Sequence, residues 1–198
     1  MRLLMIGAPG AGKGTQAVRV AEHFGVTHIS SGDLLRDHVR RETNIGRNAK
    51  EYIERGDLVP DGVVLDMLRK PVVAANEAGG YVLDGFPRTV AQAEVAYGTA
   101  RDLGVSVQVA CYLDVDRDTL ISRMLARARG VEDTREVIER RLDVYNEQTV
   151  PLIEYYRERE RLVTVGGDSP IEQVTWSLLV QIDLARKAID KRSAAGTL

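Results

Sequence analysis

The feature that most constrains this chain is a glycine-rich stretch near its N-terminus, Gly7-Ala8-Pro9-Gly10-Ala11-Gly12-Lys13-Gly14-Thr15. A short apolar run precedes it, and residues 16–24 follow with apolar side chains at helical spacing. A strand, a glycine-rich loop and a helix in this order are the context that supports a phosphate-binding loop. Turned backbone amides and a helix N-terminus together favour a bound anion. We therefore expect Lys13 to reach the outer phosphates of a nucleotide and Thr15 to face a phosphate or Mg²⁺.

Length and charge favour one domain with no general affinity for polyanions. The chain has 198 residues, long enough for one α/β domain, and a formal net charge of −2. It has 22 arginines and 5 lysines; arginine suits bidentate phosphate contacts, but a GC-rich genome produces the same bias. These features predict no nucleic-acid partner.

Cysteine usage and hydropathy predict a reducing, cytoplasmic setting. The single cysteine, Cys111, lies in an apolar run and is expected in the core, so neither an intrachain disulfide nor a cysteine-rich zinc site is predicted. The N-terminal apolar run is too short for a signal peptide, and no apolar segment approaches the ~20 residues that span a bilayer. No membrane partner is predicted.

Five short apolar runs are expected to form strands, and helical stretches separate them. This alternation favours a parallel sheet with helices on both faces. Ligands of such sheets bind at the carboxyl ends of the strands. The last dozen residues are expected to fray. The expected strands are residues 3–6, 26–29, 81–84, 107–114 and 162–165.

The segment of residues 30–60 contains no expected strand and is predicted to be a small helical insertion. Ser30 or Ser31 is a candidate N-cap for a helix. Residues 37–55 are polar with a thin apolar stripe, which predicts one continuous helix. Asp61 is the predicted cap of the helix that follows the insertion.

The third expected strand ends in Asp84, and a glycine-proline turn, Gly85-Phe86-Pro87-Arg88-Thr89, follows it. An aspartate beside a phosphate-binding loop is expected to hold Mg²⁺ or its waters. The turn places Arg88 beside the loop. Gln92 lies one helical turn further on.

Arginines surround a short connection in the second half of the chain. Arg123 and Arg127 are four residues apart and share one helix face. Arg129 follows the end of that helix, and Arg141 lies two turns into the next helix, whose expected start is Glu132, Asp133 and Thr134. A solvated charged face explains any one of these arginines, whereas several of them near a phosphate site suggest a binding role. For Arg129, a surface ion pair with the acidic pair is the alternative.

Together these residues resemble the adenylate kinase family, over residues 2 to about 184. The most specific pieces are the glycine-rich loop, Ser31-Gly32-Asp33-Leu34-Leu35-Arg36, Leu58-Val59-Pro60-Asp61 and Asp84-Gly85-Phe86-Pro87-Arg88-Thr89. The order Gly14-Thr15 after the lysine is typical of this family. The resemblance implies a three-layer α/β P-loop fold with a central five-stranded parallel sheet. Within one nucleotide kinase domain, 1–198, it implies a core (1–29, 61–126 and 135–198), an AMP-binding insertion (30–60) and a short lid (127–134).

The resemblance also implies the reaction and its residues. The reaction is reversible, Mg²⁺-dependent transfer of the ATP γ-phosphoryl to AMP, giving two ADP, by a monomer without zinc. The implied catalytic charges are Lys13, Arg88, Arg129 and Arg141, with Asp84 holding Mg²⁺ through water and Thr15 a further candidate ligand. The implied ATP contacts are Gly10, Ala11, Gly12, Lys13, Gly14, Thr15, Arg123, Arg127 and Ser169. The implied AMP contacts are Ser31, Arg36, Asp57, Leu58, Val59, Gly85, Phe86, Pro87, Arg88, Gln92, Arg129 and Arg141.

Two departures from the family pattern are visible. Ser31 stands where the family often has threonine, which keeps the hydroxyl. The lid carries one residue more between its arginine and its acidic pair than other short lids, which affects the position of Arg129.

Two other functions remain open from the sequence. A UMP/CMP kinase has the same core, although that family usually has asparagine where Thr89 stands, and Gln92 suits the adenine edge. A P-loop ATPase or nucleotide-sensing module would not need anion contacts in both the loop and the insertion. An inactive relative is disfavoured because Lys13, Asp84 and Arg88 are all present.

Overall fold

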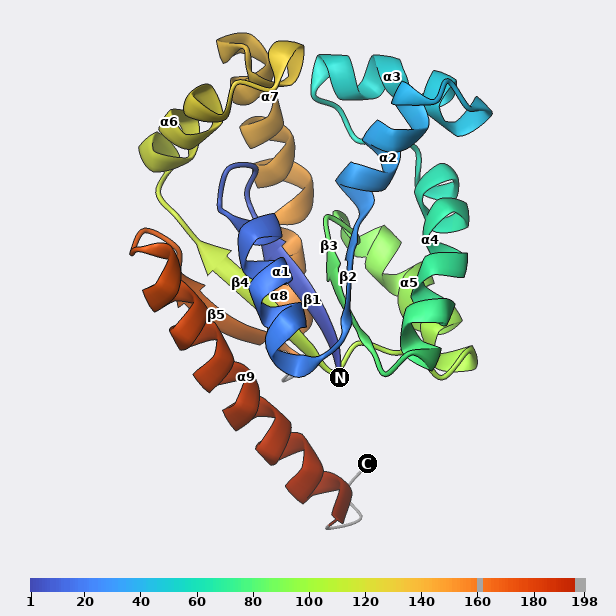
Figure 1. The fold of residues 1–198 in the computed structure, drawn as a ribbon, viewed down its shortest axis with the longest axis vertical. Coiled ribbons are helices and arrows are strands. Elements are labelled where there is room, and N and C mark those ends of the chain that lie inside the picture. The colour runs from blue at the N-terminus through green and yellow to red at the C-terminus, as the bar shows by residue number, and fades with distance from the viewer. Residues whose placement is uncertain (160–161, 195–198) are drawn as a thin grey trace.

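The computed structural model, which describes residues 1–159 and 162–194, is built on a five-stranded sheet in the order β2-β3-β1-β4-β5 (Figure 1). Every strand pair is parallel, so all the carboxyl ends lie at one edge. The predicted α/β fold class with five parallel strands is confirmed. The strands are β1 (Arg2–Gly7), β2 (Thr27–Ser30), β3 (Tyr81–Asp84), β4 (Val109–Asp114) and β5 (Leu162–Gly166).

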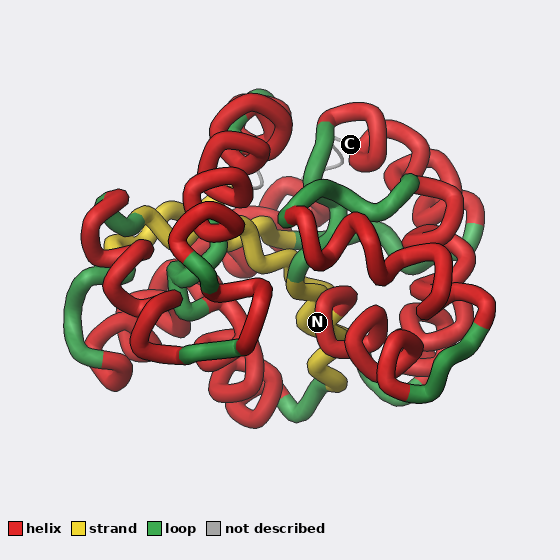
Figure 2. The backbone as a smooth tube through the Cα atoms, turned by 90° about the horizontal axis from the view of Figure 1, so that it is seen from above, coloured by secondary structure: helices red, strands yellow, loops and turns green. Residues whose placement is uncertain are grey.

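Helices cover both faces of the sheet, as the view from above shows (Figure 2). Two are short and irregular: η1 (Gly130–Asp133) is a 3₁₀ turn and η2 (Tyr145–Thr149) a π turn. The α-helices are α1 (Lys13–Phe24), α2 (Ser31–Arg40), α3 (Asn44–Arg55), α4 (Asp61–Glu77), α5 (Val90–Asp102), α6 (Arg117–Arg127), α7 (Arg135–Val144), α8 (Pro151–Arg157) and α9 (Ile171–Ala194).

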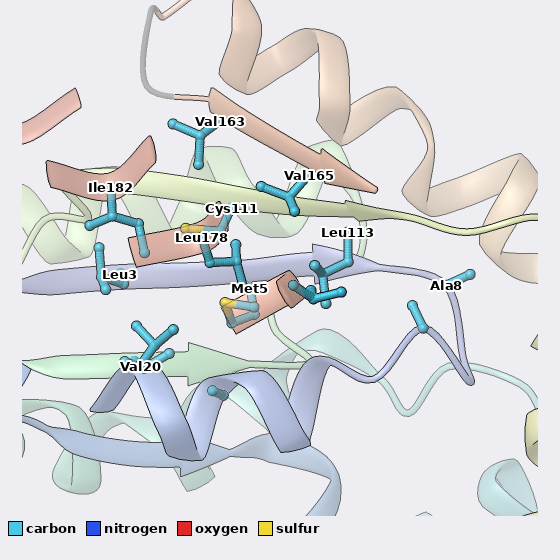
Figure 3. Packing of buried hydrophobic residues seen from close by; sticks show 14 of the residues in the cluster. Leu3, Met5, Ala8, Val20, Cys111, Leu113, Val163, Val165, Leu178 and Ile182 are labelled. Atoms are coloured by element: carbon cyan, nitrogen blue, oxygen red, sulfur yellow. The ribbon is translucent and has the colours of Figure 1, made fainter. Parts of the chain in front are cut away.

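The central strand β1 divides its side chains between two cores. Successive residues of a strand point to opposite faces. Leu3 and Met5 therefore join the cluster under α1 and α9, whereas Leu4 and Ile6 join the cluster under α4, α5 and α8. Figure 3 shows the first cluster, in which Cys111 is fully buried as predicted. Side chains of β1 therefore pack into a hydrophobic cluster on each face of the sheet. This packing fixes the position at which the glycine-rich loop begins.

The insertion contains no strand, as predicted, but its helix is broken. Residues 37–55 were expected to form one helix, and instead α2 ends at Arg40 and α3 begins at Asn44. The Thr43 hydroxyl causes the break by accepting the Gly46 N–H at 3.1 Å as the N-cap of α3. Gly46 is required because a Cβ there would lie 2.1 Å from the carbonyl oxygen of His38.

Asp61 does not cap α4, so that prediction is wrong. The N-cap position is Pro60, which forms no side-chain capping hydrogen bond. The Asp61 carboxylate instead accepts a hydrogen bond from Gln92 on α5. Of the two candidate caps for α2, Ser30 takes the position, accepting the Asp33 N–H at 3.2 Å.

The C-terminal helix is longer than expected. α9 continues to Ala194, so the prediction of fraying is wrong up to that residue, and residues 195–198 lie outside the described part of the chain. Among the described residues, no helix combines the length and the apolar character needed to cross a membrane.

Candidate nucleotide site

The glycine-rich loop joins β1 to α1 at the carboxyl edge of the sheet. Gly10 and Gly12 have φ of 85° and 90°, a left-handed conformation that favours glycine. A Cβ on Gly10 would lie 2.8 Å from the carbonyl oxygen of Leu120, so the loop packs closely on α6. Gly12 caps α1 without a side-chain acceptor. The first-turn amides of α1 therefore have no capping side chain and favour an anion.

Lys13 is the first residue of α1, directly after the turn of this loop, and it lines the neighbouring cleft. Its Nζ donates to the carbonyl oxygen of Ala8 at 2.9 Å. Burial lowers the pKa of Lys13 to about 8, Asp84 opposes this shift, and Arg88 and Arg141 add to it. A bound phosphate would reverse the effect, because a nearby anion favours the charged ammonium.

Asp84 ends β3 directly against the start of α1. It is 8% exposed, and its Oδ1 has no hydrogen-bond partner within the described part of the chain. A Cβ on Gly14 would lie 3.7 Å from Asp84 Oδ2, and the neighbouring Thr15 is exposed. Oxygen donors from one carboxylate and one hydroxyl suit Mg²⁺, which binds proteins through few side chains and keeps several waters. These residues therefore fit the ion.

A cleft beside the loop brings together most of the residues predicted to hold AMP. Gly85 turns with φ of 81°, and a Cβ there would lie 2.6 Å from Ser31 Oγ. That hydroxyl is buried without a partner among the described residues. Arg129 is absent from the lining. The predicted residues that line the cleft are Lys13, Ser31, Arg36, Asp57, Leu58, Val59, Gly85, Phe86, Pro87, Arg88, Gln92 and Arg141.

Arg88 and Gln92 form one hydrogen-bonded unit in the cleft wall. Arg88 Nε donates to the carbonyl oxygen of Gly85 at 2.7 Å, and burial lowers the pKa of Arg88. Gln92 is 2% exposed. Its Oε1 accepts the Arg88 backbone N–H at 2.7 Å, and its Nε2 donates to Asp61 Oδ1 at 2.6 Å. Asp61 was not among the predicted site residues.

Two of the three residues predicted to start a helix, Glu132 and Asp133, pair with arginines in or beside the cleft. Glu132 lines the cleft between Arg36 and Arg141, 3.6 Å from each. Asp133 accepts two hydrogen bonds from Arg127, at 2.9 and 2.6 Å. Thr134, the third residue of the predicted helix start, caps α7, so that part of the prediction is confirmed. The available signal was two adjacent carboxylates inside an arginine-rich connection.

The remaining predicted residues lie around the cleft. Arg129 donates its backbone N–H to Asp133 at 2.9 Å, while its guanidinium makes no hydrogen bond or ion pair with the described residues. Burial, followed by repulsion from Arg36 and Arg127, lowers its pKa. The surface ion pair considered for Arg129 is therefore not formed. Arg123 Nη2 donates to the carbonyl oxygen of Gly167 at 2.9 Å, which joins α6 to the loop carrying Ser169.

A model of the adenylate kinase family matches residues 5–161. The chain belongs to the adenylate kinase family. An adenylate kinase of Trichodesmium erythraeum (strain IMS101) is 43% identical over 188 residues, which cover 92% of this chain and 98% of that protein. An adenylate kinase of Kocuria rhizophila is 43% identical over 185 residues, covering 92% and 98%. An adenylate kinase of Synechococcus sp. (strain WH7803) is 45% identical over 177 residues, covering 89% and 96%.

Family membership confirms the resemblance found in the sequence. The chain is a phosphotransferase of the nucleoside monophosphate kinase class, and the UMP/CMP kinase alternative is not favoured. The roles of individual residues remain predictions.

Proposed function

We propose that the chain catalyses reversible transfer of the γ-phosphoryl of Mg²⁺-ATP to AMP, giving two ADP. The observation that carries this proposal is the cleft, which Lys13 of the glycine-rich loop lines together with Arg36, Arg88 and Arg141. A site that binds ATP alone needs only the glycine-rich loop. A second set of cations across the cleft suits a second phosphate-bearing substrate.

The proposed donor side is the loop and α6. The amides of residues 10–15 would hold the ATP phosphates, as the helix N-terminus favours. Arg123 would lie against the adenine of ATP, beside the loop that carries Ser169. Asp84, with Thr15 as a further candidate, would hold Mg²⁺, which when bound neutralises charge on the β- and γ-phosphates.

The proposed acceptor side is the opposite wall. Arg36 and Arg88 would bind the AMP phosphate, and the unpaired Ser31 hydroxyl would contribute a hydrogen bond. The adenine would lie against Gln92, which offers one donor and one acceptor. Further proposed AMP contacts are Asp57, Leu58, Val59, Gly85, Phe86 and Pro87.

Phosphoryl transfer requires alignment and positive charge rather than a covalent catalyst. The transition state is loose, with negative charge spread over the transferred group. Lys13, Arg88, Arg129 and Arg141 would stabilise that charge from several directions. No general base is needed, because the attacking oxygen of AMP is already anionic.

Water has to be kept from the γ-phosphoryl, since hydrolysis competes with transfer. We propose residues 30–60 as the AMP-binding insertion and residues 127–134 as a short lid. In Figure 1, α2 and α3 stand opposite α6 and α7 above the carboxyl edge of the sheet. Glu132 of the lid is 3.6 Å from Arg36 of the insertion, so the two segments already touch across the cleft. Closure would exclude solvent and bring Arg129 to the phosphates.

One assay tests the proposal. ATP and Mg²⁺ are mixed with AMP, UMP or CMP in turn, or with no acceptor, and the diphosphates are separated and quantified. ADP formation dependent on AMP supports it, whereas CDP or UDP formation would identify the alternative kinase. Phosphate release without an acceptor would identify an ATPase. We further propose a cytoplasmic monomer; zinc, nucleic-acid and membrane partners remain predicted absences.

Gln92→Leu is expected to weaken AMP binding by about 1–3 kcal/mol, because a paired hydrogen bond to the base is lost. ATP binding should stay almost unchanged, since Gln92 lies on the acceptor wall. Titration of each nucleotide alone by calorimetry measures both affinities. Gln173→Leu, at an exposed position of α9, is the matched control. An equal loss of affinity for AMP and ATP would show that Gln92 does not belong to the acceptor wall.

Arg129→Ala is expected to lower turnover about tenfold or more while leaving ATP affinity of the open enzyme unchanged, since the proposed contact forms only on closure. Arg127→Ala serves as the comparison, because Asp133 already holds Arg127. Arg135→Ala, an exposed residue paired with Glu139, is the control. Turnover is measured with ATP and AMP saturating. Parental turnover in Arg129→Ala beside a crippled Arg127→Ala would assign the role to Arg127.

A further inference from the structure

Asp61 fixes which way the side-chain amide of Gln92 points. A carboxylate only accepts hydrogen bonds and a backbone N–H only donates, so the two partners assign the amide atoms without ambiguity. Nε2 faces Asp61 Oδ1 at 2.6 Å, and Oε1 faces the Arg88 N–H at 2.7 Å. A 180° turn of the amide would put two acceptors together at one end and two donors at the other.

The fixed amide still has capacity for a ligand. Nε2 carries two hydrogens and Oε1 has two lone pairs. Each contact uses one of these, so Gln92 retains one N–H donor and one acceptor site while lining the cleft. Because Gln92 is 2% exposed, water has little access to the remaining pair.

The two purine types present opposite patterns to such an amide. Adenine offers the N1 acceptor and an N6–H donor. Hypoxanthine, the 6-oxo purine of IMP, offers an N1–H donor and an O6 acceptor instead. An amide free to turn would match either base by exchanging its oxygen and nitrogen. An amide held in one orientation matches one base and sets like groups against the other.

We propose that Asp61 is a positioning residue that gives the acceptor site its preference for a 6-amino purine over a 6-oxo purine, by preventing the Gln92 amide from turning. The inference rests on the proposed function, because it assumes that AMP binds against Gln92. Asp61 touches Gln92 and acts through it. Asp61 lies at an exposed position at the start of α4.

Asp61→Asn tests this role with little change of shape. Asparagine can turn either its carbonyl or its NH₂ group toward Gln92, so a turned Gln92 amide no longer sets two acceptors against each other. Only the Arg88 N–H then holds the Gln92 amide in one orientation. We measure kcat and KM with ATP and either AMP or IMP as acceptor. The ratio of kcat/KM for AMP to that for IMP should fall about tenfold, through the KM values, with the KM for ATP unchanged.

The control is Asp66→Asn, an exposed aspartate on the same helix that does not line the cleft, which should keep the parental ratio. Asp61→Ser, whose hydroxyl also donates or accepts, provides a second variant and should behave like Asp61→Asn. Thermal unfolding verifies that each variant is folded.

The outcomes separate the two proposals. If the parent enzyme does not phosphorylate AMP, the proposed function fails and this inference fails with it. If the parent uses AMP but the AMP-to-IMP ratio is the same in parent and both Asp61 variants, only the role of Asp61 is overturned. An equal fall of kcat/KM for AMP and IMP also overturns it, because a merely structural role would produce that result.

Discussion

Lys13→Met is expected to lower the rate of phosphoryl transfer about a hundredfold or more, which corresponds to ~3 kcal/mol of transition-state stabilisation. Lys13 is the cation of the glycine-rich loop and lines the cleft together with Arg88 and Arg141, and these two arginines and Asp84 all act on its pKa. Methionine keeps much of the side-chain volume and removes a charge that burial disfavours. The fold should therefore survive.

Turnover of the purified variant is measured beside thermal unfolding, with Lys187→Met, at an exposed position of α9, as the control. The pKa of about 8 provides a second readout. Above this pH the free enzyme loses the Lys13 proton, and triphosphate binding favours the charged form, so ATP binding near pH 8.5 should take up a proton. Calorimetry in buffers of different ionisation enthalpy detects that proton. Near-parental turnover, or the same proton uptake in Lys13→Met, would remove Lys13 from the mechanism.

Arg88→Met is expected to lower kcat/KM for AMP about a hundredfold, in the range found when a preorganised charge at the reacting group is removed. Arg88 is fixed by the bond from its Nε to Gly85, and its backbone N–H supports Gln92. Burial and repulsion from Arg36 lower its pKa, against the attraction of Asp84. Burial therefore disfavours the charged guanidinium of Arg88, and such perturbed charges are typical of functional sites.

Arg88→Lys separates charge from geometry. Lysine keeps the charge but lacks the planar fork that binds phosphate at two points, so it should restore only part of the lost rate. Arg101→Met, at an exposed position of α5, controls for loss of a surface charge. Steady-state kinetics with varied AMP provide the measurement. Parental kcat/KM in folded Arg88→Met would show that Arg36 and Arg141 supply the cations without it.

The sequence by itself determined the fold class, because its signals are local. Gly10 and Gly12 lie where the backbone has positive φ. The apolar run before them forms β1, whose side chains are buried on both faces of the sheet. The run of residues 81–84 coincides with β3. Helix interruptions were less predictable: the break before α3 depends on the Thr43 cap and on close packing at Gly46, which a thin apolar stripe does not reveal.

Only the tertiary structure decided which side chains meet. Asp61 reads as a helix cap from its neighbours in the chain, yet its partner Gln92 lies 31 residues away. Glu132 reads as a helix start, yet it lies between Arg36 and Arg141. Capping is a contact within a few residues, whereas these contacts depend on how α4 and residues 127–134 pack against distant segments. A carboxylate close to several donors takes the one that the folded backbone brings within reach, and spacing along the chain does not encode that choice.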